Sequence, residues 1–243
     1  MKKVMSLILA CTLLAAIPSL GLTEGTSIQF LNTPWLSSVS TVKDVIKTKL
    51  TKDLPTGEFE VKEWNTPTYG DHEVRVPDVP IYTLTYEGRS YYRVADFNVA
   101  ALTVKFVPNA SDGTYSNVNF DDYAFIEAMY RFDADAVHDC KDILNELKKK
   151  LSSLYGDPTD HYDDNDYEVY YTLNAEGYVW NNNDDHSYLE LRWAKMSSSF
   201  TGTMEHVYLT YAYADKEYIA TKQQATPVSD GESNLDVGST DGL

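Results

Sequence analysis

The chain has 243 residues, of which 43% are hydrophobic and 23% charged, a composition typical of a globular protein with a sizeable core. Its formal net charge is −17, and its one dense basic run, Lys148 to Lys150, lies next to acids. A chain this acidic repels phosphate backbones, so we expect no nucleic-acid partner.

Residues 1–21 are predicted to be a signal peptide. Lys2 and Lys3 precede an uncharged apolar run from Val4 to Ile17, and Gly21 supplies a small residue at the expected cleavage site. The apolar run is shorter than the ~20 residues that a membrane-spanning helix needs. We therefore expect cleavage before Leu22 and a secreted or extracytoplasmic mature chain without a membrane span.

The two cysteines have different predicted fates. Cys11 lies in the middle of the apolar run and leaves with the signal peptide, although a lipid anchor at this residue is an alternative. Cys140 is then the only cysteine, so the mature chain has no intrachain disulfide. Because Cys140 falls on the apolar stripe of a predicted helix, we expect a buried, inert thiol.

The first half of the chain reads as a short strand at 27–31, a helix and several strands. Val39, Val42, Ile46 and Leu50 recur at helical spacing, and Ser38 is the expected N-cap. Alternating apolar residues predict strands near 59–61, 82–86 and 102–106, with a long loop over 65–80. Residues 123–132 are apolar on both faces, as in a central strand.

The second half repeats this order. An apolar stripe with acids at its start and Gly156 after its end predicts a helix over 135–154. Strands are predicted at 167–173, 189–193 and 207–213, with turns at 174–177 and 181–186. Residues 220–243 lack aromatic side chains and are predicted to form a disordered tail.

The order of helix then strands, found twice, predicts an α+β fold over 22–219. We expect two helix-plus-antiparallel-sheet units, about 22–120 and 121–219, as a duplicated repeat. A single mixed domain is the alternative.

Two short signatures resemble those of exported bacterial α+β proteins of unknown function. The first resembles a PWG-S-S-x-x-E-V helix entry and comprises Pro34, Trp35, Ser37, Ser38 and Val42. The second resembles an L-x-x-x-L-x-x-x-YG-x-P helix exit and comprises Leu147, Leu151, Tyr155, Gly156 and Pro158. The resemblance implies an exported α+β domain and brings no catalytic residues.

The acidic segment 157–168 is the one local concentration that suggests a ligand. Hard cations such as Ca²⁺ bind clustered carboxylate oxygens, and the candidate ligands are Asp160, Asp163, Asp164 and Asp166. The spacing does not fit an EF-hand, because Val169 stands where the loop needs glycine and Ala175 where it needs glutamate. A solvated acidic loop is the alternative, and we expect no other cofactor.

Tyrosine is unusually frequent, with 19 residues against 8 phenylalanines. Tyrosine suits half-buried strand faces, and exposed rings also form platforms for sugars or peptides. The candidate platforms are Tyr91 with Tyr92, Tyr170 with Tyr171, and Tyr211 with Tyr213.

No nucleophile elbow, zinc-protease motif, P-loop or dinucleotide fingerprint is present in the sequence. We therefore expect a non-enzymatic domain that binds a protein, peptide or glycan through a sheet face or the acidic segment. The alternative is an extracellular hydrolase that uses a pair of carboxylates.

Overall fold

A computed structural model describes residues 27–50, 59–67, 80–88, 93–109, 114–115, 122–167, 171–222 and 226–227. The predicted signal peptide lies outside these residues. The helical elements are η1 (Phe30–Asn32), α1 (Val39–Lys49), α2 (Cys140–Tyr155) and α3 (Lys216–Thr221). The strands are β1 (Phe59–Pro67), β2 (Pro80–Gly88), β3 (Arg93–Val94), β4 (Phe97–Pro108), β5 (Thr114–Tyr115), β6 (Tyr123–Phe132), β7 (Asp160–Tyr167), β8 (Tyr171–Asn182), β9 (Ser187–Ser198), β10 (Gly202–Tyr213) and β11 (Thr226–Pro227).

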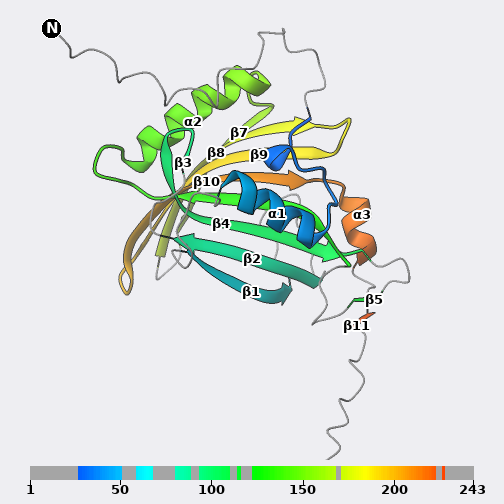
Figure 1. Cartoon of the computed structure of the whole chain (residues 1–243). Coiled ribbons are helices and arrows are strands. Elements are labelled where there is room, and N and C mark those ends of the chain that lie inside the picture. Colours follow the sequence, from blue (N-terminus) through cyan, green and yellow to red (C-terminus); the bar gives the residue numbers. More distant parts are fainter. Residues whose placement is uncertain are drawn as a thin grey trace, which may run out of the picture.

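One large antiparallel sheet dominates the structure (Figure 1). Its strand order is β1-β2-β4-β6-β10-β9-β8-β7, and the short β3 pairs with β4. The edges are therefore β1 and β7. The short strands β5 and β11 form a separate parallel pair. Strand β11 lies within the segment that was predicted as a disordered tail. Residues 228–243 of that segment lie outside the described part of the chain.

The predicted fold class, two helix-plus-sheet units, is wrong. Strands β6 and β10 pair from Phe132 opposite Val207 to Glu127 opposite Ala212, so the strands of both halves belong to one sheet. The protein is β-rich. Periodicity in a sequence identifies strands but not their neighbours in a sheet. In two separate sheets, β6 and β10 would each have one side on which the backbone N–H and C=O groups lack hydrogen-bond partners.

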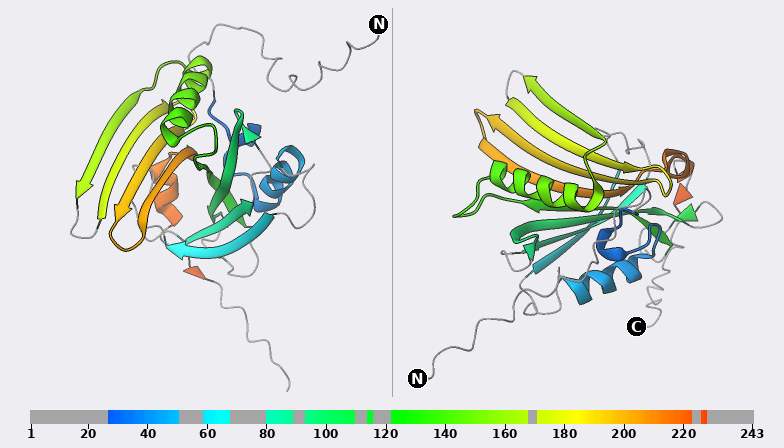
Figure 2. Two further views of the ribbon diagram at one scale, coloured as in Figure 1. Left: turned by 90° about the vertical axis from the view of Figure 1, so that its left-hand side faces the viewer. Right: turned by 90° about the horizontal axis from the view of Figure 1, so that it is seen from above.

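Both α1 and α2 pack on the same face of this sheet, which we call the helix face (Figures 1 and 2). Val42 and Ile46 of α1 and Leu144 and Leu147 of α2 are buried in one cluster with Phe125 of the central strand β6. Alternate residues of β2, β4, β6, β10, β9 and β8 complete that cluster. The two helices therefore share a single hydrophobic core.

The start of α1 is confirmed, whereas α2 starts later than predicted. Ser38 caps α1 by accepting a hydrogen bond from the backbone N–H of Thr41. In α2 the side chain of Asp139 forms a capping box with Asp142, so the helix begins at Cys140 rather than near residue 135. Val137, an apolar residue within the predicted helix 135–154, is 78% exposed.

Three of the other predicted elements also differ. Residues 27–31 form no strand, and Phe30–Asn32 is a single 3₁₀ turn in which Leu31 and Asn32 have positive φ angles. The strand predicted at 167–173 and the turn at 174–177 are replaced by β8, which runs straight through Gly177. Among the helices that the structure describes, none combines the length and the apolar character needed to cross a membrane.

Candidate binding face

The face of the sheet opposite α1 and α2, here called the second face, carries the polar side chains that alternate with the core residues. The short helix α3 packs on this face near Ala124 and Ile126, at one end of β6. At the other end of β6 the second face carries a mixture of charged and aromatic side chains. These are Arg131 on β6, His206 and Tyr208 on β10, Glu190 and Arg192 on β9, and Tyr162 on β7.

Strand register aligns five of the second-face positions into one line across the sheet. Arg131 is opposite Tyr208, Tyr208 is opposite Arg192, Arg192 is opposite Gly177, and Gly177 is opposite Tyr162. We call these five residues the arginine–tyrosine row. Neighbouring strands lie about 4.8 Å apart, so the backbones of Arg131 and Arg192 are about 10 Å apart, with Tyr208 between them.

Tyr208 is held between two cationic side chains. The guanidinium carbon of Arg192 lies 5.5 Å from the centre of the Tyr208 ring, within cation–π range. Burial raises the pKa of Tyr208, and the positive charges of Arg192 and Arg131 partly oppose that rise. The phenol therefore stays protonated at neutral pH, and all three side chains are only partly buried.

Tyr162 closes the far end of the row by lying across Gly177. A Cβ atom built on Gly177 would overlap the distal atoms of the Tyr162 ring, so only glycine leaves room for this arrangement. The Tyr162 hydroxyl donates a hydrogen bond to Oε1 of Glu190. Glu190 is buried, with 5% of its surface exposed. Burial, together with the negative charge of Glu190, raises the pKa of Tyr162.

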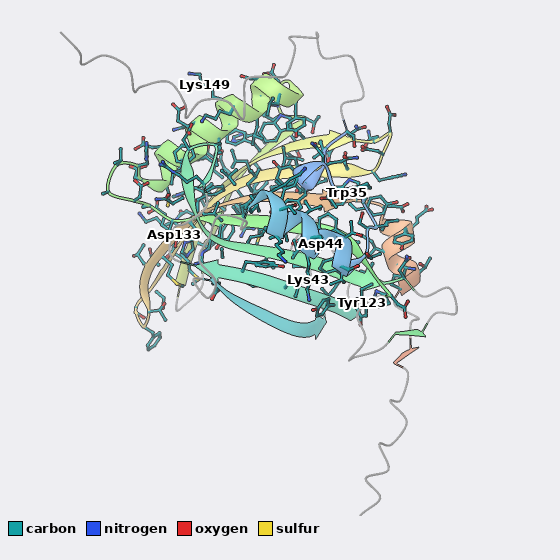
Figure 3. All side chains as sticks on the ribbon, viewed as in Figure 1. Trp35, Lys43, Asp44, Tyr123, Asp133 and Lys149 are labelled. Carbon is teal, nitrogen blue, oxygen red and sulfur yellow. The ribbon has the colours of Figure 1, made fainter. Side chains whose placement is uncertain are left out.

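Asp133 and His206 flank the other end of the row. Nδ1 of His206 lies 2.7 Å from Oδ1 of Asp133, and Nε of Arg131 lies 3.4 Å from the same oxygen. Nε of Arg131 is buried and makes no hydrogen bond in the structure, so Asp133 acts on Arg131 through charge alone. Figure 3 shows Asp133 just beyond the end of β6 that is farthest from Tyr123.

A second polar cluster lies beside α2 on the helix face. Nζ of Lys141 lies 3.6 Å from the centre of the Trp193 ring and forms an ion pair with Glu176. Glu176 also accepts a hydrogen bond from Tyr178, over whose ring Lys148 lies at 3.8 Å. Burial acts to raise the pKa of Glu176, but the hydrogen bonds from Lys141 and Tyr178 outweigh it and the pKa is lowered. These contacts attach α2 to the sheet.

The predicted metal ligands are spread along β7, which is an edge strand rather than a loop. Asp160, Asp163 and Asp164 are exposed, and strand alternation places Asp163 on the opposite face from Asp160 and Asp164. The side chain of Asp166 lies outside the described set. Among the side chains that the structure describes, no three His, Cys, Asp or Glu groups are placed to hold a metal ion. Calcium binding stays a prediction.

Of the predicted tyrosine platforms, the structure describes the side chains of Tyr211 and Tyr213 alone. Tyr211 is packed against Phe30 and Tyr130, and Tyr213 contacts Trp35 and Tyr218. Tyr91, Tyr92 and Tyr170, and the side chain of Tyr171, lie outside the described part of the structure.

Cys140 is buried, as expected. Its Sγ donates a hydrogen bond to the carbonyl oxygen of Glu205 at 3.4 Å. Burial, together with the charge of Glu205, raises the pKa of the thiol to about 11. The thiol is therefore protonated at neutral pH, which disfavours nucleophilic chemistry at this residue.

The residues of the arginine–tyrosine row were missed by the sequence prediction. Arg131, Arg192 and Tyr208 interrupt apolar runs that were predicted as strands, and an arginine within a strand is a signal of a polar second face. Placing Arg131 beside Tyr208 needed the register between β6 and β10, which are distant in the sequence. Comparison with protein-family models, curated proteins and solved structures finds no match to this chain.

Proposed function

We propose that the protein is an exported, non-enzymatic binding domain whose binding surface is the arginine–tyrosine row. The observation that carries the proposal is the alignment of Arg131, Tyr208 and Arg192 on three adjacent strands of one sheet face. Arginine and tyrosine are enriched among the residues that dominate binding energies. Export is supported by the N-terminal sequence, which has the charge and length pattern of a signal peptide.

The row is built on rigid elements. Three of its positions, Arg131, Tyr208 and Arg192, lie on β6, β10 and β9, each of which pairs with a strand on both sides. Tyr162 is fixed by the Tyr162–Glu190 hydrogen bond, and Tyr208 by the neighbouring guanidinium of Arg192. A surface whose side chains are already ordered loses less conformational entropy when a ligand binds.

The alternative, a hydrolase with a carboxylate pair, requires one carboxyl group whose pKa is raised so that it can act as an acid. The described carboxyl groups with a shifted pKa are Asp96, Asp135 and Glu176, and in each the pKa is lowered. No contact among the described side chains favours the hydrolase, which stays a prediction.

An array of immobilised oligosaccharides and peptides tests the proposal. We expect the purified protein to bind one class of ligand, and Tyr208→Thr to weaken that binding by about tenfold or more, because a central tyrosine of a binding surface contributes strongly. Threonine keeps the strand propensity of the position. The matched control is Phe200→Thr, which removes an aromatic ring that is 78% exposed at the turn between β9 and β10.

Binding that survives Tyr208→Thr unchanged, or that is lost equally in Phe200→Thr, would contradict the assignment of the row as the binding surface. The melting temperatures of both variants show whether a loss of binding reflects a loss of folding.

A further inference from the structure

We infer that Lys150 and the turn between β3 and β4 form a latch that fastens one flank of α2, and that this latch opens locally while the large sheet stays folded. The latch is defined as Lys150 with Ala95 and Asp96, the two residues of the turn. The inference is independent of the proposed binding surface, because the turn lies beside α2 on the helix face (Figure 1).

The turn has a strained backbone. Val94 of β3 pairs with Phe97 of β4, so the connection between the two strands has two residues. Ala95 has a φ angle of 53° and Asp96 one of 76°, the left-handed conformation that a two-residue hairpin turn requires at both positions. Asparagine and glycine are favoured there, whereas in alanine this conformation is disfavoured about tenfold. The residues of the turn therefore do not favour its closed form by themselves.

Lys150 holds both residues of the turn. Its Nζ donates one hydrogen bond to the carbonyl oxygen of Ala95 at 2.8 Å and another to Oδ2 of Asp96 at 3.0 Å. The side chain of Asp96 is 89% exposed, and an ion pair this exposed contributes little to stability. The hydrogen bond to Ala95 is partly buried and contributes more. Contacts of this strength keep the latch closed but let it open reversibly.

The latch and the other lysine contacts of α2 hold opposite flanks of the helix. Lys141 lies over Trp193 of β9, and Lys148 lies over Tyr178 of β8. Lys150 instead contacts the turn that precedes β4. Because β6 and β10 lie between β4 and β9 in the sheet, opening of the latch frees one flank of α2 while the other flank stays attached.

Opening of the latch also uncovers an apolar side chain. Phe97 is 3% exposed, and its ring lies 5.8 Å from Nζ of Lys150 and 5.2 Å from the centre of the His138 ring. Strand β3 pairs with β4 through two residues, so few backbone hydrogen bonds oppose movement of the turn. The open form therefore exposes part of the core beside α2 while the long strands stay paired.

Native-state hydrogen exchange, followed by nuclear magnetic resonance, tests the latch. The amide of Phe97 reports on the turn, and the amide of Leu84, a buried residue of β2, reports on the sheet. We expect Lys150→Met to accelerate exchange at Phe97 about tenfold and to leave exchange at Leu84 unchanged, because methionine keeps a long side chain and a high helix propensity but has no N–H donors. The matched control is Lys149→Met, which removes the same charge from an exposed neighbour on α2 (Figure 3) and is expected to change neither rate.

Ala95→Gly tests the strain of the turn separately. Glycine adopts the left-handed conformation without a steric penalty, so we expect this substitution to slow exchange at Phe97 about three- to tenfold, both alone and together with Lys150→Met. Faster exchange in Ala95→Gly would overturn the inference, as would an unchanged rate at Phe97 in Lys150→Met or an equal acceleration in Lys149→Met. Equal acceleration at Phe97 and Leu84 in Lys150→Met would also overturn it, because Lys150 would then stabilise the whole fold rather than a local latch.

Discussion

Replacing Ile46 or Leu144 with alanine is expected to lower the free energy of unfolding by about 2–5 kcal/mol, and in the same cooperative transition. Ile46 belongs to α1 and Leu144 to α2, and both are buried. Each substitution removes apolar contacts and leaves a cavity in the core. Because the two helices pack on one face of one sheet and share one core, a cavity under either helix weakens the whole structure.

Chemical denaturation followed by both circular dichroism and tryptophan fluorescence measures this effect. Leu154→Ala is the matched control, because Leu154 lies on α2 but is 37% exposed, and its replacement is expected to cost far less. Two separate transitions, with Ile46→Ala shifting one and Leu144→Ala the other, would restore the two-unit architecture that the structure excludes.

Gly177→Ala is expected to lower the free energy of unfolding by about 1–3 kcal/mol, although alanine normally stabilises a strand relative to glycine. The added methyl group occupies the space of the Tyr162 ring. When the ring is displaced, the buried carboxylate of Glu190 loses the hydrogen bond from the Tyr162 hydroxyl. The cost of the substitution therefore comes from Glu190, on a strand that is adjacent to β8.

A double-mutant cycle separates this mechanism from a general sensitivity of β8. In a Tyr162→Ala background the ring is absent, so Gly177→Ala is expected to be neutral or slightly stabilising. Gly202→Ala is a useful comparison, because no atom lies near the added Cβ and only the positive φ of 78° opposes the substitution. An equal cost of Gly177→Ala in both backgrounds would show that Tyr162 does not account for the glycine.

The sequence predicted strands better than it predicted their arrangement. Residues 123–132 were correctly expected to form a central strand, since a segment apolar on both faces must be covered on both. Nothing in that pattern shows that β10, far along the chain, is a neighbour of β6. The acidic residues of β7 suggested a loop. They are compatible with a strand because β7 is at the edge of the sheet, where charges are tolerated on both faces and discourage pairing with another chain.

Gly177 shows the same limit at the level of one residue. Its sequence context, after Asn174, is typical of a turn, and it was predicted as one. Its actual role depends on a tyrosine from the neighbouring strand, a contact that only the register of β7 and β8 reveals. The arginine–tyrosine row was likewise invisible, because Arg131 lies on β6, which is distant in the sequence from its neighbour β10, and because the other members depend on the exact register of four successive strands.

Nuclear magnetic resonance titration tests the central claim, binding at the row, most directly. The side-chain N–H signals of Arg131 and Arg192 report on the second face. The indole N–H group of Trp193, which donates a hydrogen bond to Glu205, gives a signal that reports on the helix face. Titration with the strongest ligand from the array is predicted to shift both arginine signals and leave the Trp193 signal in place. A shift of the Trp193 signal with both arginine signals unchanged would contradict the account and move the binding surface to the other face of the sheet.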